Sequence, residues 1–199
     1  HQAVGRPRER QDLGEGDRGA GGGSLGEVEE VDAMAIPPSK AGDVVKPRVR
    51  LRSVEVADLP ALYQIQAEPE GSRMAAVIPR TEEAFHAHWA KVLCDANVVP
   101  RVILADEVLA GSISCFQREG LNFLGYWLAR EHWGKGIASR ALALLLEDVS
   151  IRPLHARAAR TNVASIRVLQ RCGFVVTGYR HSPADERFLE CEEAMFVLM

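Results

Sequence analysis

The sequence predicts an α/β (α+β) domain with a mixed, mostly antiparallel central sheet of about seven strands and helices on both faces. From residue 48 onwards, strand-like and helix-like segments follow one another in the order β α α β β β α β α β β. Hairpins precede a single β-α-β crossover. Because hairpins pair strands antiparallel and a crossover pairs them parallel, the sheet is mixed. A hydrophobic content of 47% is typical of a globular domain.

Residues 1–47 are predicted to be a flexible, Gly- and charge-rich N-terminal tail, which leaves residues 48–199 as the folded domain. The tail holds 9 of the chain's 17 glycines and no aromatic residue. Such a composition cannot bury enough apolar surface to form a core. The chain begins with His1, whereas Met34 opens the stretch MAIPPSK just before the regular pattern. We therefore expect residues 1–33 to be a dispensable leader, or upstream sequence that is not normally translated.

The first part of the domain is predicted to be a strand followed by two helices, with a loop between the helices. Residues 48–53 (RVRLRS) alternate in polarity like a strand, and residues 56–66 repeat apolar side chains at helical spacing. Residues 68–79 contain Gly and Pro and are predicted to be a loop. Thr81 then caps a helix over residues 81–93, whose first turn carries acidic side chains where the helix dipole favours them.

The middle of the domain is predicted to be a run of three strands. Residues 101–105 and 108–116 flank a short turn at Asp106 and Glu107, which indicates a hairpin. Residues 123–130 (FLGYWLAR) form the next strand.

The last part of the domain alternates between helices and strands. Residues 137–149 have the apolar stripe of an amphipathic helix. A strand over residues 154–159 and a helix over residues 163–172 follow. Residues 174–180 and 187–199 complete the sheet as two C-terminal strands.

Charge, cysteine and hydropathy patterns exclude several classes of function. The net charge of −3 resides in residues 1–47, which hold 6 Lys and Arg against 9 Asp and Glu, so the domain carries no basic field for nucleic acid. The four cysteines have no CxxC spacing, which argues against a metal site and a disulfide framework. No apolar run is long enough to span a membrane. We therefore expect a cytoplasmic protein with reduced thiols that binds neither nucleic acid, membrane nor metal.

Residues 130–139 (REHWGKGIAS) form a glycine-containing turn before a helix, and three interpretations compete. A Walker phosphate loop requires Gly where Ala129 stands and Ser or Thr at Gly136. A dinucleotide fingerprint beginning at Gly134 lacks its third glycine, because Ser139 occupies that position. The remaining functional interpretation is a turn that cradles another pyrophosphate on free amides at the helix start, alongside a plain turn with no ligand.

The sequence around this turn resembles a known family. GYWLAREHWGKGIASRAL (residues 125–142) and NVASIRVLQRCGF (residues 162–174) closely resemble the GNAT superfamily of acetyl-coenzyme A-dependent N-acetyltransferases. The resemblance is greatest to the ribosomal-protein-alanine N-acetyltransferases of the RimJ/RimL type and covers residues 48–199. It implies the GNAT fold, acetyl-coenzyme A (acetyl-CoA) as cosubstrate and a primary amine as acceptor.

The resemblance assigns the turn to the cosubstrate. It implies that backbone amides of residues 132–138 wrap the pyrophosphate of coenzyme A (CoA), and that the main chain of Trp127 and Leu128 hydrogen-bonds the pantetheine arm in a gap between strands. Asn162 is implied beside that arm, and it fits equally well as the N-cap of the following helix. The positions assigned to CoA are Trp127, Leu128, His132, Trp133, Gly134, Lys135, Gly136, Ile137, Ala138, Asn162 and Ser165.

The resemblance also implies two catalytic roles on the cosubstrate side. The Leu128 amide faces the thioester carbonyl, where it stabilises the oxyanion that forms as the amine attacks. Ser165 lies near the sulfur and donates a proton to the leaving thiolate; a solvated hydroxyl in the first helical turn is the alternative interpretation.

The general base departs from the family pattern. Many relatives carry a carboxylate at the position of Phe123, and a second acidic position common in the family is His155 here. His155 could itself act as a base, because an unperturbed imidazole titrates near neutrality. In one branch of the family a glutamate between the last two strands takes the role, which makes Glu186 the candidate base, with a solvated loop carboxylate as the alternative.

The absence of a carboxylate at Phe123 affects which kind of amine can act as acceptor. An α-amine with a pKa of about 7.8 is roughly 14% neutral at pH 7, whereas a lysine with a pKa of about 10.4 is roughly 0.04% neutral. We therefore expect a protein N-terminal α-amine as acceptor. A small-molecule amine, such as an antibiotic or polyamine, and a non-catalytic CoA-binding module are the alternatives. The sequence is compatible with a monomer or a homodimer.

Overall fold

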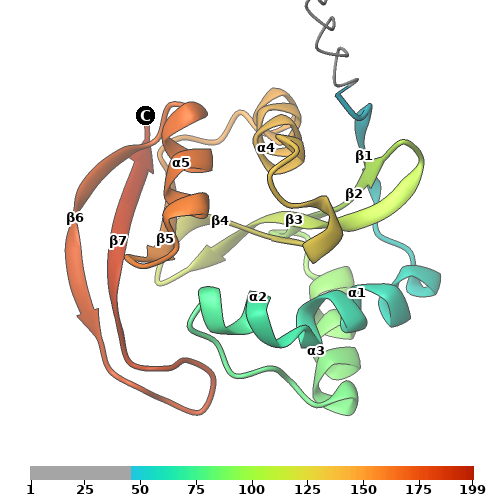
Figure 1. Cartoon of the computed structure of the whole chain (residues 1–199), viewed down its shortest axis with the longest axis horizontal. Coiled ribbons are helices and arrows are strands. Elements are labelled where there is room, and N and C mark those ends of the chain that lie inside the picture. Colours follow the sequence, from blue (N-terminus) through green and yellow to red (C-terminus); the bar gives the residue numbers. More distant parts are fainter. Residues whose placement is uncertain (1–45) are drawn as a thin grey trace, which may run out of the picture. The chain divides into compact units, whose positions relative to one another are not determined.

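A computed structural model of the chain describes residues 46–199 (Figure 1). The predicted tail, residues 1–47, lies outside the described residues except for Lys46 and Pro47, and the expected leader, residues 1–33, lies wholly outside them. Within the described part, no helix is long and apolar enough to span a membrane, and no three His, Cys, Asp or Glu side chains are placed to hold a metal ion. The four cysteines lie in this part and form no disulfide.

Seven strands form one sheet in the order β1-β2-β3-β4-β5-β7-β6, which confirms the predicted mixed sheet. Neighbouring strands are antiparallel except for β4 and β5, which are parallel. The strands are β1 (Val49–Ser53), β2 (Val99–Ala105), β3 (Val108–Arg118), β4 (Leu121–Leu128), β5 (Leu154–Ala159), β6 (Val175–Ser182) and β7 (Cys191–Leu198).

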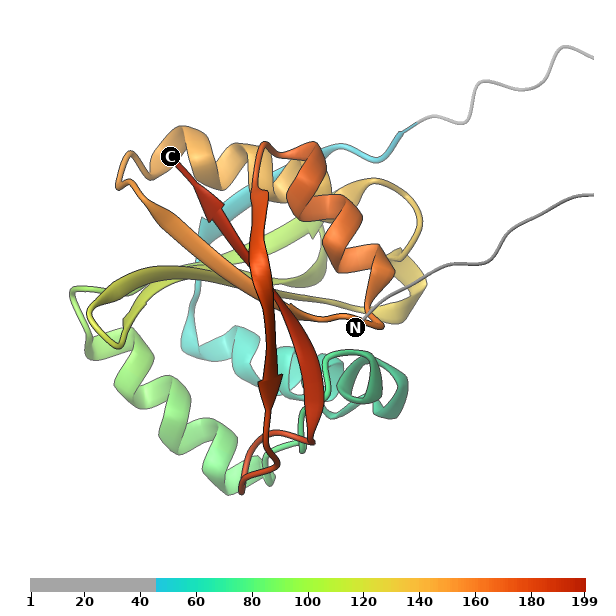
Figure 2. The same ribbon diagram turned by 90° about the vertical axis from the view of Figure 1, so that its left-hand side faces the viewer.

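Helices cover both faces of the sheet, as predicted (Figures 1 and 2). One face carries α1 (Leu59–Ala67), which follows the 3-10 turn η1 (Val56–Asp58), together with α2 (Pro69–Met74) and α3 (Glu82–Cys94). The other face carries α4 (Ile137–Asp148) and α5 (Val163–Arg171), and a second 3-10 turn, η2 (Arg130–His132), leads from β4 towards α4.

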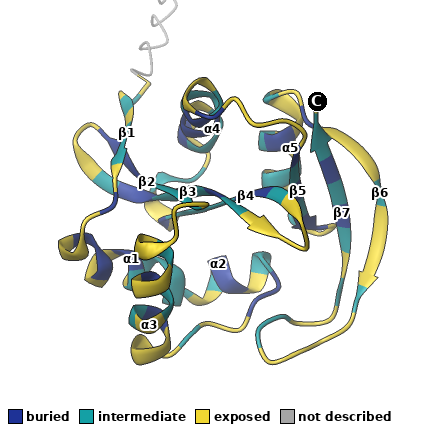
Figure 3. Cartoon of the chain, turned by 180° about the vertical axis from the view of Figure 1, so that it is seen from behind, coloured by how far each residue is buried: buried dark blue, intermediate teal, exposed yellow. Residues whose placement is uncertain are grey.

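A hydrophobic core lies on each face of the sheet, where the helices present their buried side chains (Figure 3). The larger core packs α4 and α5 against the strands, and Leu142 and Leu145 of α4 are fully buried in it. The smaller core packs α1 and α3 around Phe85 and Trp89. These buried positions repeat at helical spacing, so burial of apolar surface explains the periodicity visible in the sequence.

The predicted loop over residues 68–79 is wrong in part, because it contains α2. The Glu68 carboxylate accepts a hydrogen bond from the Gly71 amide at 2.6 Å and caps the helix, and Pro69 fits its first turn. Gly71 is buried, and a Cβ there would lie 3.4 Å from the ring of Trp127. The cap, the proline and burial therefore outweigh the low helix propensity of glycine.

The parallel strands β4 and β5 separate soon after they meet. They pair at Asn122 with Leu154 and at Phe123 with His155 only. From Leu124 to its end at Leu128, β4 therefore has β3 on one edge and an open gap on the other.

On its paired edge, β4 approaches β3 very closely at Gly111. The register between β2 and β3 shifts here, since Ile103 pairs with Gly111 and Leu104 pairs with Leu109. A Cβ added at Gly111 would lie 2.0 Å from the carbonyl oxygen of Trp127. Only glycine allows the two backbones to come this close.

Replacing Gly111 should therefore destabilise the fold. We expect Gly111→Ala to lower the free energy of unfolding by about 1–3 kcal/mol, the usual cost of overpacking, because backbone atoms must move. Thermal unfolding followed by circular dichroism measures the loss. Gly125→Ala is the matched control in the same strand pair, since its Cβ would lie at an ordinary 3.4 Å from the Phe116 ring. Equal losses at the two positions would contradict this explanation.

Candidate active site

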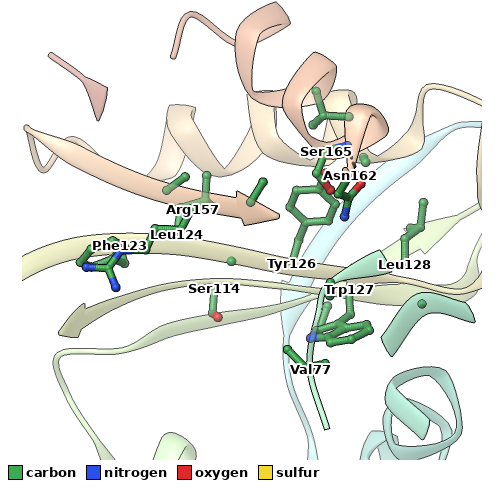
Figure 4. A pocket seen from close by; sticks show the side chains of 18 of the residues that line it. Val77, Ser114, Phe123, Leu124, Tyr126, Trp127, Leu128, Arg157, Asn162 and Ser165 are labelled. Atoms are coloured by element: carbon green, nitrogen blue, oxygen red, sulfur yellow. Dashed lines mark hydrogen bonds between the residues drawn. The ribbon is translucent and has the colours of Figure 1, made fainter. Parts of the chain in front are cut away.

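A cavity of about 890 Å³ occupies the gap between β4 and β5. Its walls come from β3, β4, β5, the helices α2, α3 and α5, and the loop before α4 (Figure 4). It is the natural place for a ligand, because it combines an open strand edge with a helix start.

The loop before α4 presents a short row of free backbone amides. Gly134 and Gly136 have φ angles of 71° and 76°, in the left-handed region that glycine adopts without strain. Within residues 46–199, the amides of Gly134, Lys135 and Gly136 donate to no backbone carbonyl. The first amides of α4, from Ile137 and Ala138, lack intrahelical acceptors because every helix leaves its first amides unpaired. Such a row, at the positive end of a helix dipole, suits a phosphate group.

The predicted row of amides, residues 132–138, is wrong at its first two members. The His132 amide donates to the Ala129 carbonyl at 2.9 Å, and the Trp133 amide donates to the Arg130 carbonyl at 3.1 Å. Both amides are used by the 3-10 turn η2, so the free row runs over residues 134–138. Lys135 is exposed and does not line the cavity, whereas the side chains of His132 and Trp133 do lie along it.

Trp133 and its neighbours hold this loop against β4 and α2. The Trp133 indole N–H donates to the Leu128 carbonyl at 2.8 Å. Arg130 forms an ion pair with Glu70 of α2 at 2.7 Å. The loop is therefore fixed to the end of β4 and to the helix on the opposite face of the sheet.

The open edge of β4 presents the main chain of Leu128 but not that of Trp127. The Trp127 carbonyl faces β3 beside Gly111, and the Leu128 carbonyl faces the Trp133 indole. Since N–H and C=O of one strand residue point to the same edge, the Leu128 amide faces the gap. The role predicted for Leu128 requires an amide in this position, and it stays a prediction. The predicted main-chain role of Trp127 is wrong, because its peptide group faces the neighbouring strand.

Asn162 and Ser165 stand at the start of α5, beside the gap. The Asn162 Oδ1 accepts from the Ser165 amide at 3.1 Å, which confirms Asn162 as the N-cap. The Ser165 hydroxyl oxygen accepts a hydrogen bond from the Tyr126 hydroxyl at 3.0 Å, and Figure 4 shows these side chains facing one another. Burial raises the pKa of Tyr126, so its phenol stays protonated and remains a donor at neutral pH.

Tyr126 is a site residue that the sequence analysis missed. It lies inside the GYWL stretch, but alternation along a strand alone cannot tell which face lines a cavity. The hydrogen bond to Ser165, 39 residues away, is what brings it into the site.

The structure does not bring the predicted base, Glu186, to the cavity. Glu186 is exposed in the connection between β6 and β7, which we call the β6–β7 loop, and its neighbours Arg187 and Phe188 line the cavity instead. Asp185 shapes this loop, because its Oδ1 accepts from the amides of Arg187 and Phe188 at 2.7 Å each. These hydrogen bonds lower the pKa of Asp185.

The two strand positions that carry acids in relatives hold an aromatic cluster here. Phe123 is 5% exposed, stacks with Phe116 and lies 5.6 Å from the His155 ring. Arg157 covers the Phe123 ring at 4.7 Å and forms an ion pair with Glu119. His155 packs in this cluster and does not line the cavity.

The end of the cavity at α3 and the β6–β7 loop is basic. Arg80, His88 and Arg187 line it. Burial lowers the pKa of Arg80, and that of Arg187 to about 10. Burial, together with the charges of both arginines and Lys91, lowers the pKa of His88 to about 4. These residues are scattered in the sequence and belong to no motif.

Residues 48–175, more than half of the chain, match the acetyltransferase (GNAT) domain family. In sequence, the chain is similar to an uncharacterized N-acetyltransferase, p20, of Bacillus licheniformis. The two are 27% identical over 144 residues, which cover 66% of this chain and 81% of the relative.

Solved structures share the fold. One is an acetyltransferase from Salmonella typhimurium that modifies the N-terminal serine of 50S ribosomal subunit protein L7/L12. It has a TM-score of 0.65 and 20% identity, over 76% of this chain and 94% of that chain. Another is a spermidine N-acetyltransferase from Vibrio cholerae in complex with CoA and spermine. It has a TM-score of 0.63 and 17% identity, over 75% of this chain and 95% of that chain. The names of these two enzymes give different acceptors, so the structural similarity shows the fold and does not identify the acceptor of this chain.

Proposed function

The chain belongs to the acetyltransferase (GNAT) domain family and is an N-acetyltransferase that uses acetyl-CoA; on that premise we propose that its acceptor is the α-amine at a protein N-terminus. The lack of a strong general base in the cavity carries this proposal. Among residues 46–199, the carboxylates that line the cavity are Asp95 and Glu193, and Glu193 is ion-paired with Arg180 at 2.8 Å. Of the two histidines that line the cavity, His88 has a pKa of about 4 and is a weak base, and His132 lies in η2, next to the glycine loop.

A site without a strong base requires an amine that arrives partly neutral. At pH 7 an α-amine is roughly 14% neutral and a lysine side chain roughly 0.04%, a difference of more than a hundredfold in the reactive form. Water in the open cavity can accept the proton that the amine loses on attack. The α-amine therefore fits the site better than a lysine or an aliphatic polyamine.

We assign the cosubstrate to the glycine loop and the gap in the sheet. The amides of residues 134–138 would bind the pyrophosphate, and the open edge of β4 at Leu128 would bind the pantetheine arm. The free loop amides and the open edge of β4 support this assignment. Their N–H groups are hydrogen-bond donors, and the chain itself supplies no acceptors for them. Acetyl-CoA supplies the acetyl group as a thioester.

We assign two steps of the transfer to residues on either side of the gap. The Leu128 N–H would donate to the thioester oxygen and stabilise the negative charge that develops there. Ser165 would donate its hydroxyl proton towards the leaving thiolate. Because Tyr126 donates to the Ser165 oxygen, the Ser165 hydrogen is free to be donated to another group. When Ser165 gives up that proton, the Tyr126 phenol can supply another one through the same hydrogen bond.

Gly134→Glu should weaken acetyl-CoA binding by tenfold or more, because the side chain adds bulk and negative charge beside the pyrophosphate amides. Isothermal titration calorimetry measures the Kd. Gly120→Glu is the matched control: Gly120 also has a positive φ, of 75°, and nothing lies within 4 Å of its Cβ position, so both variants carry the same backbone strain. Unchanged affinity in the Gly134 variant would refute the assignment.

Ser165→Ala and Tyr126→Phe should lower kcat by roughly 100-fold, the low end of what general acid catalysis contributes, and leave the Kd for acetyl-CoA nearly unchanged. Steady-state release of free thiol measures kcat. Ser182→Ala, at the end of β6 and away from the cavity, controls for loss of a hydroxyl. A wild-type kcat in both test variants would show that neither hydroxyl takes part in proton transfer.

The α-amine proposal predicts a distinctive pH dependence. For a peptide with a free N-terminus, kcat/KM should rise about tenfold per pH unit and level off near pH 8, as the α-amine loses its proton. A peptide with a blocked N-terminus and an internal lysine, and spermidine, should be at least a hundredfold poorer at pH 7. Turnover of either one at the rate of the free peptide would contradict the proposal.

A further inference from the structure

Three basic side chains from distant parts of the chain gather at one end of the cavity. Arg80 follows α2, His88 is on α3 and Arg187 is in the β6–β7 loop. The connection after α2 and the β6–β7 loop run side by side in Figure 1, and the Ile78 amide donates to the Arg187 carbonyl at 2.8 Å. The backbone therefore holds the two arginines on neighbouring segments.

Little countercharge faces the cluster, because Asp185 acts on Arg187 through space and no carboxylate forms a salt bridge with either arginine in residues 46–199. Within residues 46–199, neither Arg80 nor Arg187 forms an ion pair, and the nearby Asp185 uses its Oδ1 to accept from two loop amides. The Arg187 Nη1 is buried and has no hydrogen-bond partner in this part of the chain. Two partly buried guanidinium groups that repel each other, one with an unsatisfied nitrogen, are costly without a bound anion.

We propose that Arg80 and Arg187 bind an anionic group, a carboxylate or a phosphate monoester, that the acceptor carries close to its amine. A planar guanidinium matches both groups with two parallel hydrogen bonds. His88 is neutral at pH 7 and can add a ring N–H donor. The inference rests on the proposed function and narrows it: the favoured N-termini carry an acidic or phosphorylated residue in their first few positions, and polyamines are repelled.

The first test needs no variant. Four peptides share one free N-terminus and differ only at the second and third residues, which are Glu, phosphoserine, Gln or Lys. We expect kcat/KM, measured by thiol release, to be about tenfold or more higher for an anionic peptide than for the Gln peptide, and lowest for the Lys peptide. The better of the two anionic peptides identifies the anion. Equal values for the anionic and Gln peptides overturn the proposal.

The second test removes the guanidinium groups one at a time. Arg187→Gln and Arg80→Gln should lower kcat/KM for the better anionic peptide by about tenfold or more, with little effect on the Gln peptide or on the Kd for acetyl-CoA. Arg187→Lys, which keeps the charge without the planar fork, should lose less. The control is Arg160→Gln, which removes a surface arginine paired with Glu192. Equal losses for the anionic and Gln peptides would overturn the proposal, because a structural defect affects both.

Small-molecule acceptors distinguish failure of the anion site from failure of the N-terminal acceptor. Free aspartate and phosphoethanolamine carry an amine and an anion without a peptide. If wild type acetylates these and not the peptides, and Arg187→Gln abolishes the activity, the anion site stands and the N-terminal acceptor is wrong. If wild type acetylates all the peptides without an anionic preference, the N-terminal acceptor stands and the anion site is wrong.

Discussion

The unpaired edge of β4 is the constraint on which the rest of the site depends. A strand inside a sheet normally satisfies its peptide groups on both sides, yet β4 parts from β5 after two residue pairs. The separation creates the cavity and turns the Leu128 amide towards it. It also sets α5 across the gap from β4, where Tyr126 and Ser165 can meet. A backbone feature of the sheet thus positions the groups to which we assign the transfer step, namely the Leu128 amide, Tyr126 and Ser165.

Two contacts fix the glycine loop in place, and the loop amides need a fixed orientation to bind a phosphate group. The Trp133 indole is bonded to the end of β4, and Arg130 is ion-paired with Glu70 of α2. Gly71 lets α2 approach the ring of Trp127. The loop, the strand end and the helix on the opposite face therefore form one packed unit, so the orientation of the loop amides is coupled to packing on both sides of the sheet.

Periodicity predicted nearly all of the fold, because each helix and strand buries one face against a common core. It failed at α2, a six-residue helix that contains Gly71 and is too short to show a helical repeat of apolar side chains. The resemblance pointed to the glycine loop as a segment, but it could not say that η2 already uses the His132 amide. Arg80 and Arg187 belong to no motif, and only the tertiary fold brings their side chains to the same cavity.

The segment after α2 and the β6–β7 loop together form the basic end of the cavity, to which we assign the acceptor. The family match covers the glycine loop, α5 and the segment after α2, and it stops at residue 175, before the β6–β7 loop begins. Two surface connections can diverge in sequence without disturbing the sheet or the phosphate cradle. Such a division lets one catalytic scaffold be redirected to new amines over evolutionary time by exchanging a few loop residues.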